Sequence, residues 1–397
     1  MELEPAQITC SARNMKIEVV SDIESFRRLE PVWDCLLEQS NADHPFVTFA
    51  WVWTWWECFG AGRSLYILVI KEGERIVGIA PLMLTRKRIY GARLRCLEFL
   101  ANVHTPRLDL IIAFRRADAY RAIWNHLMEV RNKWDLLLLC QIPDGSPTLE
   151  HFSRFAKENQ LPFAQWRCAN SPYVLLGSDW QGYFNSLKAK YRANLRRRMT
   201  RLTDMGRVSL DILSGEHCDG ALAEGLRLEG AVWKDQCGTS IQSRKEVQRF
   251  YTEIADVFSK RGWLRLNFLK LGDRRIAFQY AVCYKNKTFL LKPGYDPAYG
   301  PYSPSHLLCL LYLENASRAG QLEFDFLGAE DDWKLQWTRN VRAHYWMYIF
   351  SDSPLPSVLY FLKFHIIPEL QRKRFYQNLV HFLTAFRRRL GLMEANL

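Results

Sequence analysis

The sequence predicts a mixed α/β fold made of two similar domains, and three observations support this. First, hydrophobic residues make up 48% and charged residues 24% of the 397 residues, which is typical of a globular chain long enough for two cores. Second, strand-like and helix-like segments alternate along the chain. Third, the hairpin at residues 65–80 is repeated at 264–279, with the turns Gly73-Glu74-Arg75 and Gly272-Asp273-Arg274. The repeat indicates an internal duplication, although two common hairpins can also match by coincidence.

The first half begins with a strand at Lys16–Val20, followed by the capping box Ser21-Asp22-Ile23-Glu24, which opens a helix reaching about Glu38. A Trp-rich helix is expected at Phe49–Phe59, with its indoles facing a core or a domain interface. The remaining elements of this half are strands at Leu65–Ile70, Ile76–Leu84, Arg95–Leu100, Asp109–Ile112 and Leu136–Cys140, and a helix at Asp118–Asn132.

The second half repeats this order after a basic helix at Tyr183–Met205. The capping box Ser243-Arg244-Lys245-Glu246 opens a helix that runs to Gly262. The other elements are strands at Val208–Leu213, Leu264–Leu271, Arg275–Tyr284, Thr288–Lys292 and Leu322–Leu327, and helices at Asp219–Trp233 and from Ser303 to Gly320.

The helix that opens at Ser303 is the strongest local signal. Ser303 is a suitable N-cap, Pro304 fits the first helical position, and Gly320 fits the left-handed position after the helix. The free N–H groups of Ser305, His306 and Leu307, together with the helix dipole, form an anion site if this end is exposed. An ordinary buried helix with good caps has the same pattern.

Charge and cysteine content narrow the function classes. The formal net charge of +12 suggests an anionic partner such as CoA phosphates, a nucleotide sugar, nucleic acid or an anionic membrane. The ten cysteines form no C-x-x-C pair and have no nearby His at metal spacing, so reduced thiols, a cytoplasmic setting and no metal are expected. We see no secretory signal at the N-terminus and no apolar run of about 18 residues.

Short motifs lie in a fixed order at residues 190–197, 232–234, 294–296, 302–308, 324–326 and 333–337, with further segments at 46–59 and 78–82. In sequence and order these motifs resemble those of the GNAT acyltransferases. The resemblance is greatest to the CelD/BcsL type linked to cellulose and exopolysaccharide biosynthesis, which is related to the tandem FemAB-type proteins. The resemblance spans roughly residues 15–350. The glycine-rich pyrophosphate loop of GNAT proteins is absent, and Ser305 stands where the subgroup often has Gly.

This resemblance implies tandem GNAT-like domains, each with a mixed, mainly antiparallel sheet flanked by helices, at residues 15–178 and 179–350, followed by a basic helical tail at 351–397. It also implies transfer of an acyl group, most simply acetyl from acetyl-CoA, to an amine or hydroxyl acceptor. The phosphates would bind at Ser303, Ser305, His306 and Leu307, and the pantetheine arm would bind along the strand that ends at Lys292.

Candidate catalytic residues are Asp325, as base or substrate anchor, Tyr295 and His306. His306 suits a neutral base because a helix N-terminus lowers the pKa of histidine. Candidate acceptor-binding residues are Arg192, Arg196, Trp233, Asp296 and Lys334. Each also has a structural interpretation: a hydrogen-bonded Asp, turn residues at Tyr295 and Asp296, a partly exposed His, a surface Lys, and a solvated face of the basic helix.

Two further function classes stay open: FemAB-like aminoacyl transfer, and a catalytically inactive scaffold for a polysaccharide synthase. We do not expect nucleic acid to be a partner, because no long helical arm for tRNA is visible. The tail alternates apolar and basic residues, which fits either packing on the domain or peripheral contact with an anionic membrane at its inner face.

Overall fold

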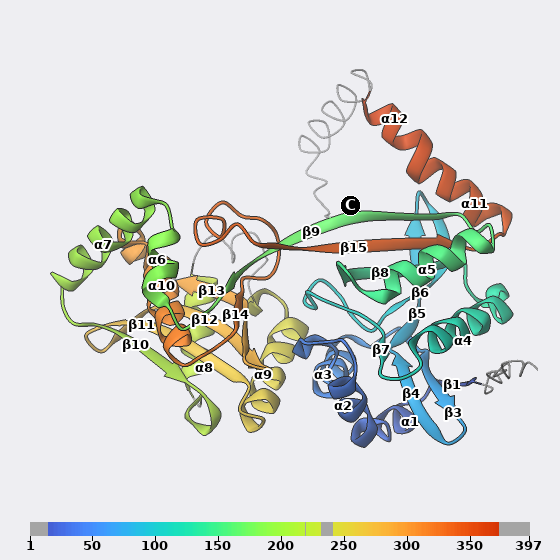
Figure 1. Ribbon diagram of the computed structural model, residues 1–397, viewed down its shortest axis with the longest axis horizontal. Helices are drawn as coiled ribbons and strands as arrows, with labels where there is room; N and C mark the ends of the chain where they lie inside the picture. Colours follow the sequence, from blue (N-terminus) through green and yellow to red (C-terminus); the bar gives the residue numbers. More distant parts are fainter. Residues whose placement is uncertain (1–14, 219, 232–240, 373–397) are drawn as a thin grey trace, which may run out of the picture.

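The computed structural model describes residues 15–218, 220–231 and 241–372. The molecule is elongated and has two lobes (Figure 1). The first lobe, on the right in Figure 1, is built mainly from the first half of the chain, and the second lobe from residues after 179. Both lobes combine sheets with flanking helices, which confirms the predicted mixed α/β fold.

The first lobe contains a four-stranded sheet in the order β1-β3-β4-β7. Its strands are β1 (Met15–Val20), β3 (Ile67–Glu72), β4 (Arg75–Ala80) and β7 (Ile111–Ile112), and the helices of this lobe are α1 (Ile23–Arg27), α2 (Glu30–Gln39), α3 (Phe49–Phe59), α4 (Arg116–Glu129) and α5 (Pro147–Glu158). The single helix predicted from Ser21 to about Glu38 is in fact two. It breaks before Pro31, because proline has no N–H and restricts the residue before it.

The Trp-rich helix α3 faces a core, as predicted. Trp51 and Trp55 are fully buried, and the Trp51 ring packs edge-on against Phe250 of the second lobe, with 5.1 Å between centroids. One apolar cluster therefore continues from the first lobe into the second.

A second sheet of eleven strands joins the two lobes, in the order β10-β11-β12-β13-β14-β9-β15-β8-β6-β5-β2. Its strands from the first half are β2 (Ser64–Leu65), β5 (Leu82–Ile89), β6 (Ala92–Phe99), β8 (Leu136–Pro143) and β9 (Phe163–Leu175), and those from the second half are β10 (Val208–Leu213), β11 (Leu264–Leu271), β12 (Arg274–Tyr284), β13 (Lys287–Tyr295), β14 (Glu323–Asp325) and β15 (Val341–Phe350).

Two long strands are exchanged between the lobes. Strand β9, which precedes the second half, pairs with β14 of the second lobe, whereas β15, which ends the second half, pairs with β8 of the first. The two strands also pair with each other along most of their length and run side by side across the molecule (Figure 1). Neither strand was predicted from the sequence.

Helices cover the two faces of the second-lobe sheet. Helices α8 (Ala221–Gly230) and α9 (Lys245–Lys260) belong to the cluster shared with the first lobe, whereas α6 (Trp180–Ser186), α7 (Ala189–Thr203) and α10 (Pro304–Arg318) form a separate cluster. The basic helix predicted at Tyr183–Met205 is thus divided into α6 and α7 at Leu187, whose backbone is extended.

Strands β13 and β14 pair over only three residues and then part. The parallel pairing ends at Phe289 and Asp325. Next to this point β13 has a β-bulge at Leu291. Ala281 of β12 pairs with Leu290 and Tyr280 pairs with Lys292, so Leu291 has no partner in the register of the two strands. Beyond Asp325 the chain follows β9 instead, since the Phe326 N–H donates to the Pro172 carbonyl at 3.0 Å. The second lobe is therefore open between β13 and the segment after β14.

The last described segment is a helical rod that extends away from the first lobe (Figure 1). It comprises α11 (Pro354–Phe361), a π-helical stretch (Leu362–Ile366) and α12 (Ile367–Arg372). Part of the predicted tail, residues 373–397, lies outside the described residues. In the part of the chain that the structure describes, no helix is long and apolar enough to cross a membrane.

Candidate active site

A pocket of about 610 Å³ opens where β13 and β14 part. Its lining comes from strands β12 and β13, the first turn of α10 and the loop after β14. The lining residues that sequence reasoning had selected are Tyr295, Ser303, Ser305 and His306, and they are joined by Asp331 and Trp333. The structure thus brings four predicted residues together in one pocket.

The first turn of α10 differs from the predicted phosphate grip. Ser303 is the N-cap, but its backbone is left-handed, with φ 50°, and its side chain makes no capping hydrogen bond. The N–H groups of His306 and Leu307 both donate to the Ser303 carbonyl oxygen, at 3.0 and 3.3 Å. The Leu307 side chain is fully buried. Two of the three N–H groups expected to bind phosphate therefore already have an acceptor in the protein.

The His306 side chain is neutral and is fixed by a hydrogen bond and a ring contact. Its Nδ1 lies 2.7 Å from the Tyr191 hydroxyl, and its ring stacks on Trp337. Burial, with a smaller contribution from the charge of Arg198, lowers the pKa of His306 to about 4. The imidazole is therefore uncharged at neutral pH, as the sequence suggested, although burial rather than the helix dipole is the main cause.

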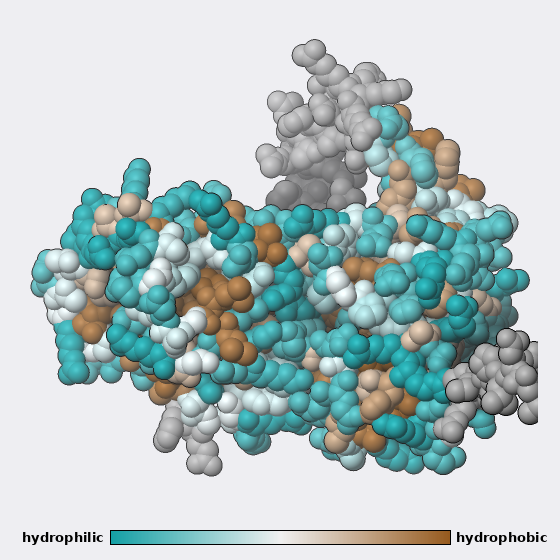
Figure 2. Space-filling model, in the orientation of Figure 1, coloured by the Kyte–Doolittle hydropathy of each residue, from teal (hydrophilic) through white to brown (hydrophobic). Residues whose placement is uncertain are grey.

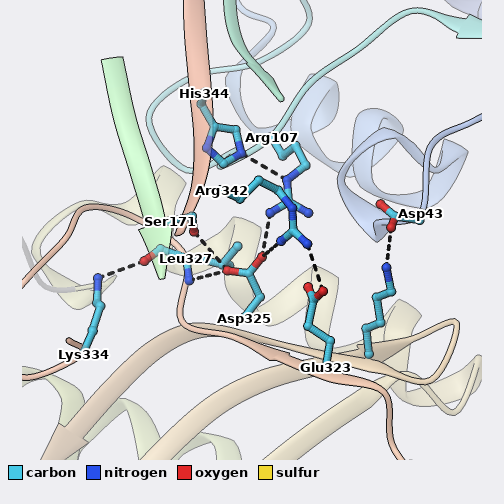
Figure 3. Close-up of polar contacts among 10 residues, drawn as sticks. Asp43, Arg107, Ser171, Glu323, Asp325, Leu327, Lys334, Arg342 and His344 are labelled. Atoms are coloured by element: carbon cyan, nitrogen blue, oxygen red, sulfur yellow. Dashed lines mark hydrogen bonds and ion pairs between the residues drawn. The ribbon is translucent and has the colours of Figure 1, made fainter. Parts of the chain in front are cut away.

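Asp325 is a buried anchor between the lobes (Figure 3). Its Oδ2 accepts hydrogen bonds from Arg107 at 2.6 Å and Arg342 at 2.7 Å, and its Oδ1 accepts from Ser171 Oγ at 3.0 Å and the Leu327 N–H at 2.8 Å. These four bonds fill the lone-pair positions of a carboxylate. Asp325 is also fully buried, so the geometry fits the hydrogen-bonded structural Asp and fits neither a general base nor a substrate anchor.

The residues around Asp325 extend this network. Arg342 also pairs with Glu323 at 2.9 Å, and the Arg107 Nε donates to His344 Nε2 at 3.1 Å. Burial, followed by the charge of Arg107, lowers the pKa of His344 to about 3, so His344 is a neutral acceptor here. Both lobes therefore meet in one hydrogen-bonded cluster.

Lys334 holds the loop that forms one wall of the pocket. Its Nζ donates to the carbonyl oxygens of Leu327 and Ala329, at 2.8 and 3.0 Å, and pairs with Asp331 at 2.8 Å. The side chain is only 9% exposed. Lys334 is therefore buried and not the surface lysine of the alternative interpretation, and its contacts within the loop do not favour binding of an acceptor.

The other predicted residues lie outside the pocket lining. Asp296 caps the turn after β13 by accepting from the Ala298 N–H, and it pairs with Arg274 at 2.7 Å. Lys292 lies over the Tyr251 ring, 5.4 Å from its centroid, rather than in the pocket.

On the basic helix α7, Arg192 donates to the carbonyl oxygens of Asn185 and Leu187 at the end of α6. Arg196 is exposed and lies 5.3 Å from the Phe184 ring centroid. Trp233 lies outside the described residues. In the described ranges 15–218, 220–231 and 241–372, no group of three or more His, Cys, Asp or Glu residues is arranged to hold a metal ion.

Sequence reasoning missed Arg107, Arg342 and Ser171. Arg107 precedes Asp325 by 218 positions and lies in a loop of the first lobe. Arg342 and Ser171 lie on the two exchanged strands. No local pattern in the sequence marks such partners.

Residues 189–335 match the model of an acetyltransferase (GNAT) domain. No curated protein matches the chain in sequence.

Among solved structures, FemX superposes with a TM-score of 0.57 at 12% identity, covering 83% of this chain and 98% of FemX. A conserved protein of unknown function from Bacteroides thetaiotaomicron gives a TM-score of 0.52 at 11% identity, covering 84% of this chain and all of the other.

The C-terminal domain of a candidate lysylphosphatidylglycerol synthetase from Agrobacterium fabrum gives a TM-score of 0.50 at 11% identity, covering 85% of this chain and 94% of that domain. At these identities the likeness concerns the fold. The family match includes β13, the turn that opens α10 and the loop held by Lys334. The chain is therefore a transferase whose residues 189–335 form an acetyltransferase domain of the GNAT superfamily.

Proposed function

We propose that this protein transfers an acyl group, most simply acetyl, from acyl-CoA to an amine or hydroxyl acceptor. The observation that carries the proposal is the parting of β13 and β14 at the Leu291 bulge, which opens a pocket within the matched acetyltransferase segment. A pocket of about 610 Å³ is within the usual range for ligand sites. The acyl-CoA, the carrier of the acyl group, would lie along β13, with its phosphates toward the first turn of α10.

Of the three residues that the sequence suggested for catalysis, Tyr295 best fits a role at the reacting atoms. In the reaction the acceptor attacks the thioester carbonyl carbon, the C–S bond breaks, the acceptor loses a proton and the CoA thiolate gains one. The Tyr295 side chain lines the pocket, so we propose that its hydroxyl donates to the leaving sulfur.

His306 and Asp325 fit supporting roles better. The pKa of about 4 for His306 is far below the operating pH, which makes it a poor general base. We propose that its imidazole orients the carrier. Asp325 is instead a positioning residue. It accepts a hydrogen bond from the Leu327 N–H and thereby fixes the segment after β14 that diverges from β13.

For the acceptor, we propose a saccharide-linked amine or hydroxyl used in exopolysaccharide or cell-envelope synthesis. The support is the resemblance of the motifs at residues 190–197, 302–308 and 324–326 to CelD/BcsL-type proteins. The exposed Arg196 on α7 is the predicted acceptor residue that retains an accessible charge.

Aminoacyl transfer is the second candidate. Its support is the fold shared with FemX and with the candidate lysylphosphatidylglycerol synthetase, together with the net charge of +12, which suits an anionic donor.

Calorimetric titration with acetyl-CoA tests the first proposal. We expect wild-type protein to bind, and Ser305→Trp, which fills the pocket, to bind at least tenfold more weakly. Lys260→Trp, at an exposed site on α9, is the control and is expected to bind as wild type. Absence of binding by wild type at millimolar ligand would overturn acyl-CoA transfer, and a charged-tRNA transfer assay would then test aminoacyl transfer.

We also propose peripheral contact of the helical rod, residues 354–372, with an anionic membrane at its cytoplasmic face. Its exposed apolar side chains are Leu355, Val358, Phe361, Ile366 and Leu370, and Figure 2 shows hydrophobic side chains along the rod. Basic residues follow at 372–374, and this combination is typical of interfacial helices. Co-sedimentation with anionic liposomes should fall for Val358→Glu/Phe361→Glu; equal sedimentation of the variant and wild type would remove this proposal.

A further inference from the structure

Helix α7 carries an arginine on its inward face. Tyr191, Leu195 and Leu202 are buried along this face, which packs against α10 and the turn before it. Arg198 follows Leu195 by three positions and precedes Leu202 by four, so its Cα lies on the same stripe. A charged residue therefore occupies a position where the helix otherwise presents apolar side chains to the pocket wall.

Arg198 has no compensating carboxylate among the residues that the structure describes. It forms no hydrogen bond or ion pair with any residue in the described part of the chain, although it is only partly exposed. Tyr191 of α7 bonds to His306 in the first turn of α10, and Arg198 lies two helical turns after Tyr191 on the face that packs against α10. Besides burial, the charge of Arg198 contributes to the lowered pKa of His306. Removing a guanidinium from bulk water without an anionic partner is unfavourable, which points to an anion that completes the site.

A second arginine of the same helix lies at the same wall. The Arg201 guanidinium is 5.1 Å from the ring centroid of Tyr302, the residue directly before the N-cap Ser303. Unlike Arg198, Arg201 is exposed, and it pairs with no carboxylate among the described residues, so its charge is accessible to a ligand in solution. Two uncompensated cations thus lie beside the wall formed by Ser303, Ser305 and His306.

Arg198 and Arg201 lie beside a helix N-terminus whose backbone offers few free N–H donors to a phosphate. The glycine-rich loop of GNAT proteins is missing from the sequence, and the N–H groups of His306 and Leu307 donate to Ser303. A phosphate at this wall needs other positive partners, and guanidinium groups provide charge and directed N–H donors together.

We propose that Arg198 and Arg201 of α7 bind the phosphate groups of CoA and take the place of the missing phosphate loop. This inference rests on the proposed acyl-CoA site and adds to it a specific charge requirement. The site should therefore select carriers with a diphosphate over the same thiol without phosphates.

The experiment compares binding of CoA and of pantetheine, which has no phosphate, by calorimetry. We expect Arg198→Gln and Arg201→Gln each to weaken CoA binding about tenfold, the size expected for one charge-assisted contact, and to leave pantetheine binding unchanged. The fall in CoA affinity between 50 and 300 mM salt should also be smaller in the variants, because salt screens charge pairs.

Arg197→Gln is the matched control. Arg197 lies on the same helix and carries the same charge, but its guanidinium donates to Asn194 on α7 itself, whereas that of Arg201 lies over Tyr302. CoA binding by this variant should therefore remain that of wild type. Circular dichroism and thermal unfolding check that all variants fold.

The outcomes separate the two proposals. If wild type binds CoA and both arginine variants bind it equally well with the same salt dependence, only the phosphate assignment is overturned. If all three arginine variants lose CoA affinity equally, the effect is general electrostatics, and the assignment to Arg198 and Arg201 is again wrong. If wild type binds no CoA, both proposals fall.

Discussion

Arg107 of the first lobe and Asp325 of the second form a 2.6 Å ion pair in which the two side chains are 2% and 0% exposed. Asp325 also fixes the start of the loop that leaves β13. The Asp325 carboxylate thus accepts hydrogen bonds both from Arg107 of the first lobe and from the Leu327 N–H of the loop. Through this carboxylate the first lobe influences the position of the loop that forms a pocket wall, although no described residue of the first lobe lines the pocket.

Removal of the Asp325 charge should destabilise the protein strongly. In Asp325→Asn, Arg107 and Arg342 lose their shared carboxylate while remaining largely buried, and breaking such a pair typically costs about 3–5 kcal/mol. Urea unfolding measures the loss. Asp256→Asn, which removes an exposed partner of Lys260, should change stability by less than about 1 kcal/mol. A general base would behave differently: its replacement would abolish turnover and leave stability nearly unchanged.

Lys334→Met should affect both stability and carrier binding. The variant leaves the carbonyl oxygens of Leu327 and Ala329 without their donor, and hydrogen bonds to charged groups contribute about 1.5–3 kcal/mol. The wall that contains Asp331 and Trp333 should then become less ordered, so KM for acyl-CoA should rise more than kcat falls. If Lys334 instead binds the acceptor, KM for the acceptor would rise at unchanged stability.

Ser303→Gly should leave the fold intact and stabilise it by up to about 1 kcal/mol. Ser303 has φ 50° and its side chain makes no capping bond, so glycine loses no contact and relieves a left-handed conformation that is unfavourable for residues with a Cβ. Thermal unfolding measures the change. Ser303→Val, with a branched Cβ, should destabilise the protein; equal midpoints for both variants would contradict the strain.

Stability should fall as the pH is lowered from about 6.5 to 4. Burial lowers the pKa of His104 and His306 to about 4 and of His344 to about 3. In this window the unfolded chain binds more protons than the native protein, so the free energy of unfolding decreases as the pH falls. His306→Gln should reduce the slope of unfolding free energy against pH by nearly one proton in this window. An unchanged slope would show that His306 titrates normally in the folded protein.

The sequence predicted the site unevenly, for physical reasons. The helix that opens at Ser303 and the strand Thr288–Lys292 were predicted correctly, because capping and periodicity are local signals. The roles of Asp325 and Lys334 depend on distant or folded backbone partners: the Arg107 guanidinium comes from another lobe, and Lys334 binds carbonyl oxygens that only a folded loop brings together. Alternation along β14 placed Glu323 and Asp325 on one face, but it could not reveal that Arg107 and Arg342, from distant parts of the chain, bind the carboxylates there.

A crystal structure of the protein soaked with CoA tests acyl-CoA binding most directly. We expect density for CoA between β13 and the first turn of α10, in contact with Tyr295 and Ser305 and with its diphosphate near Arg198 and Arg201. Density for CoA at another surface, or an empty pocket at a CoA concentration that saturates binding in solution, would contradict this expectation.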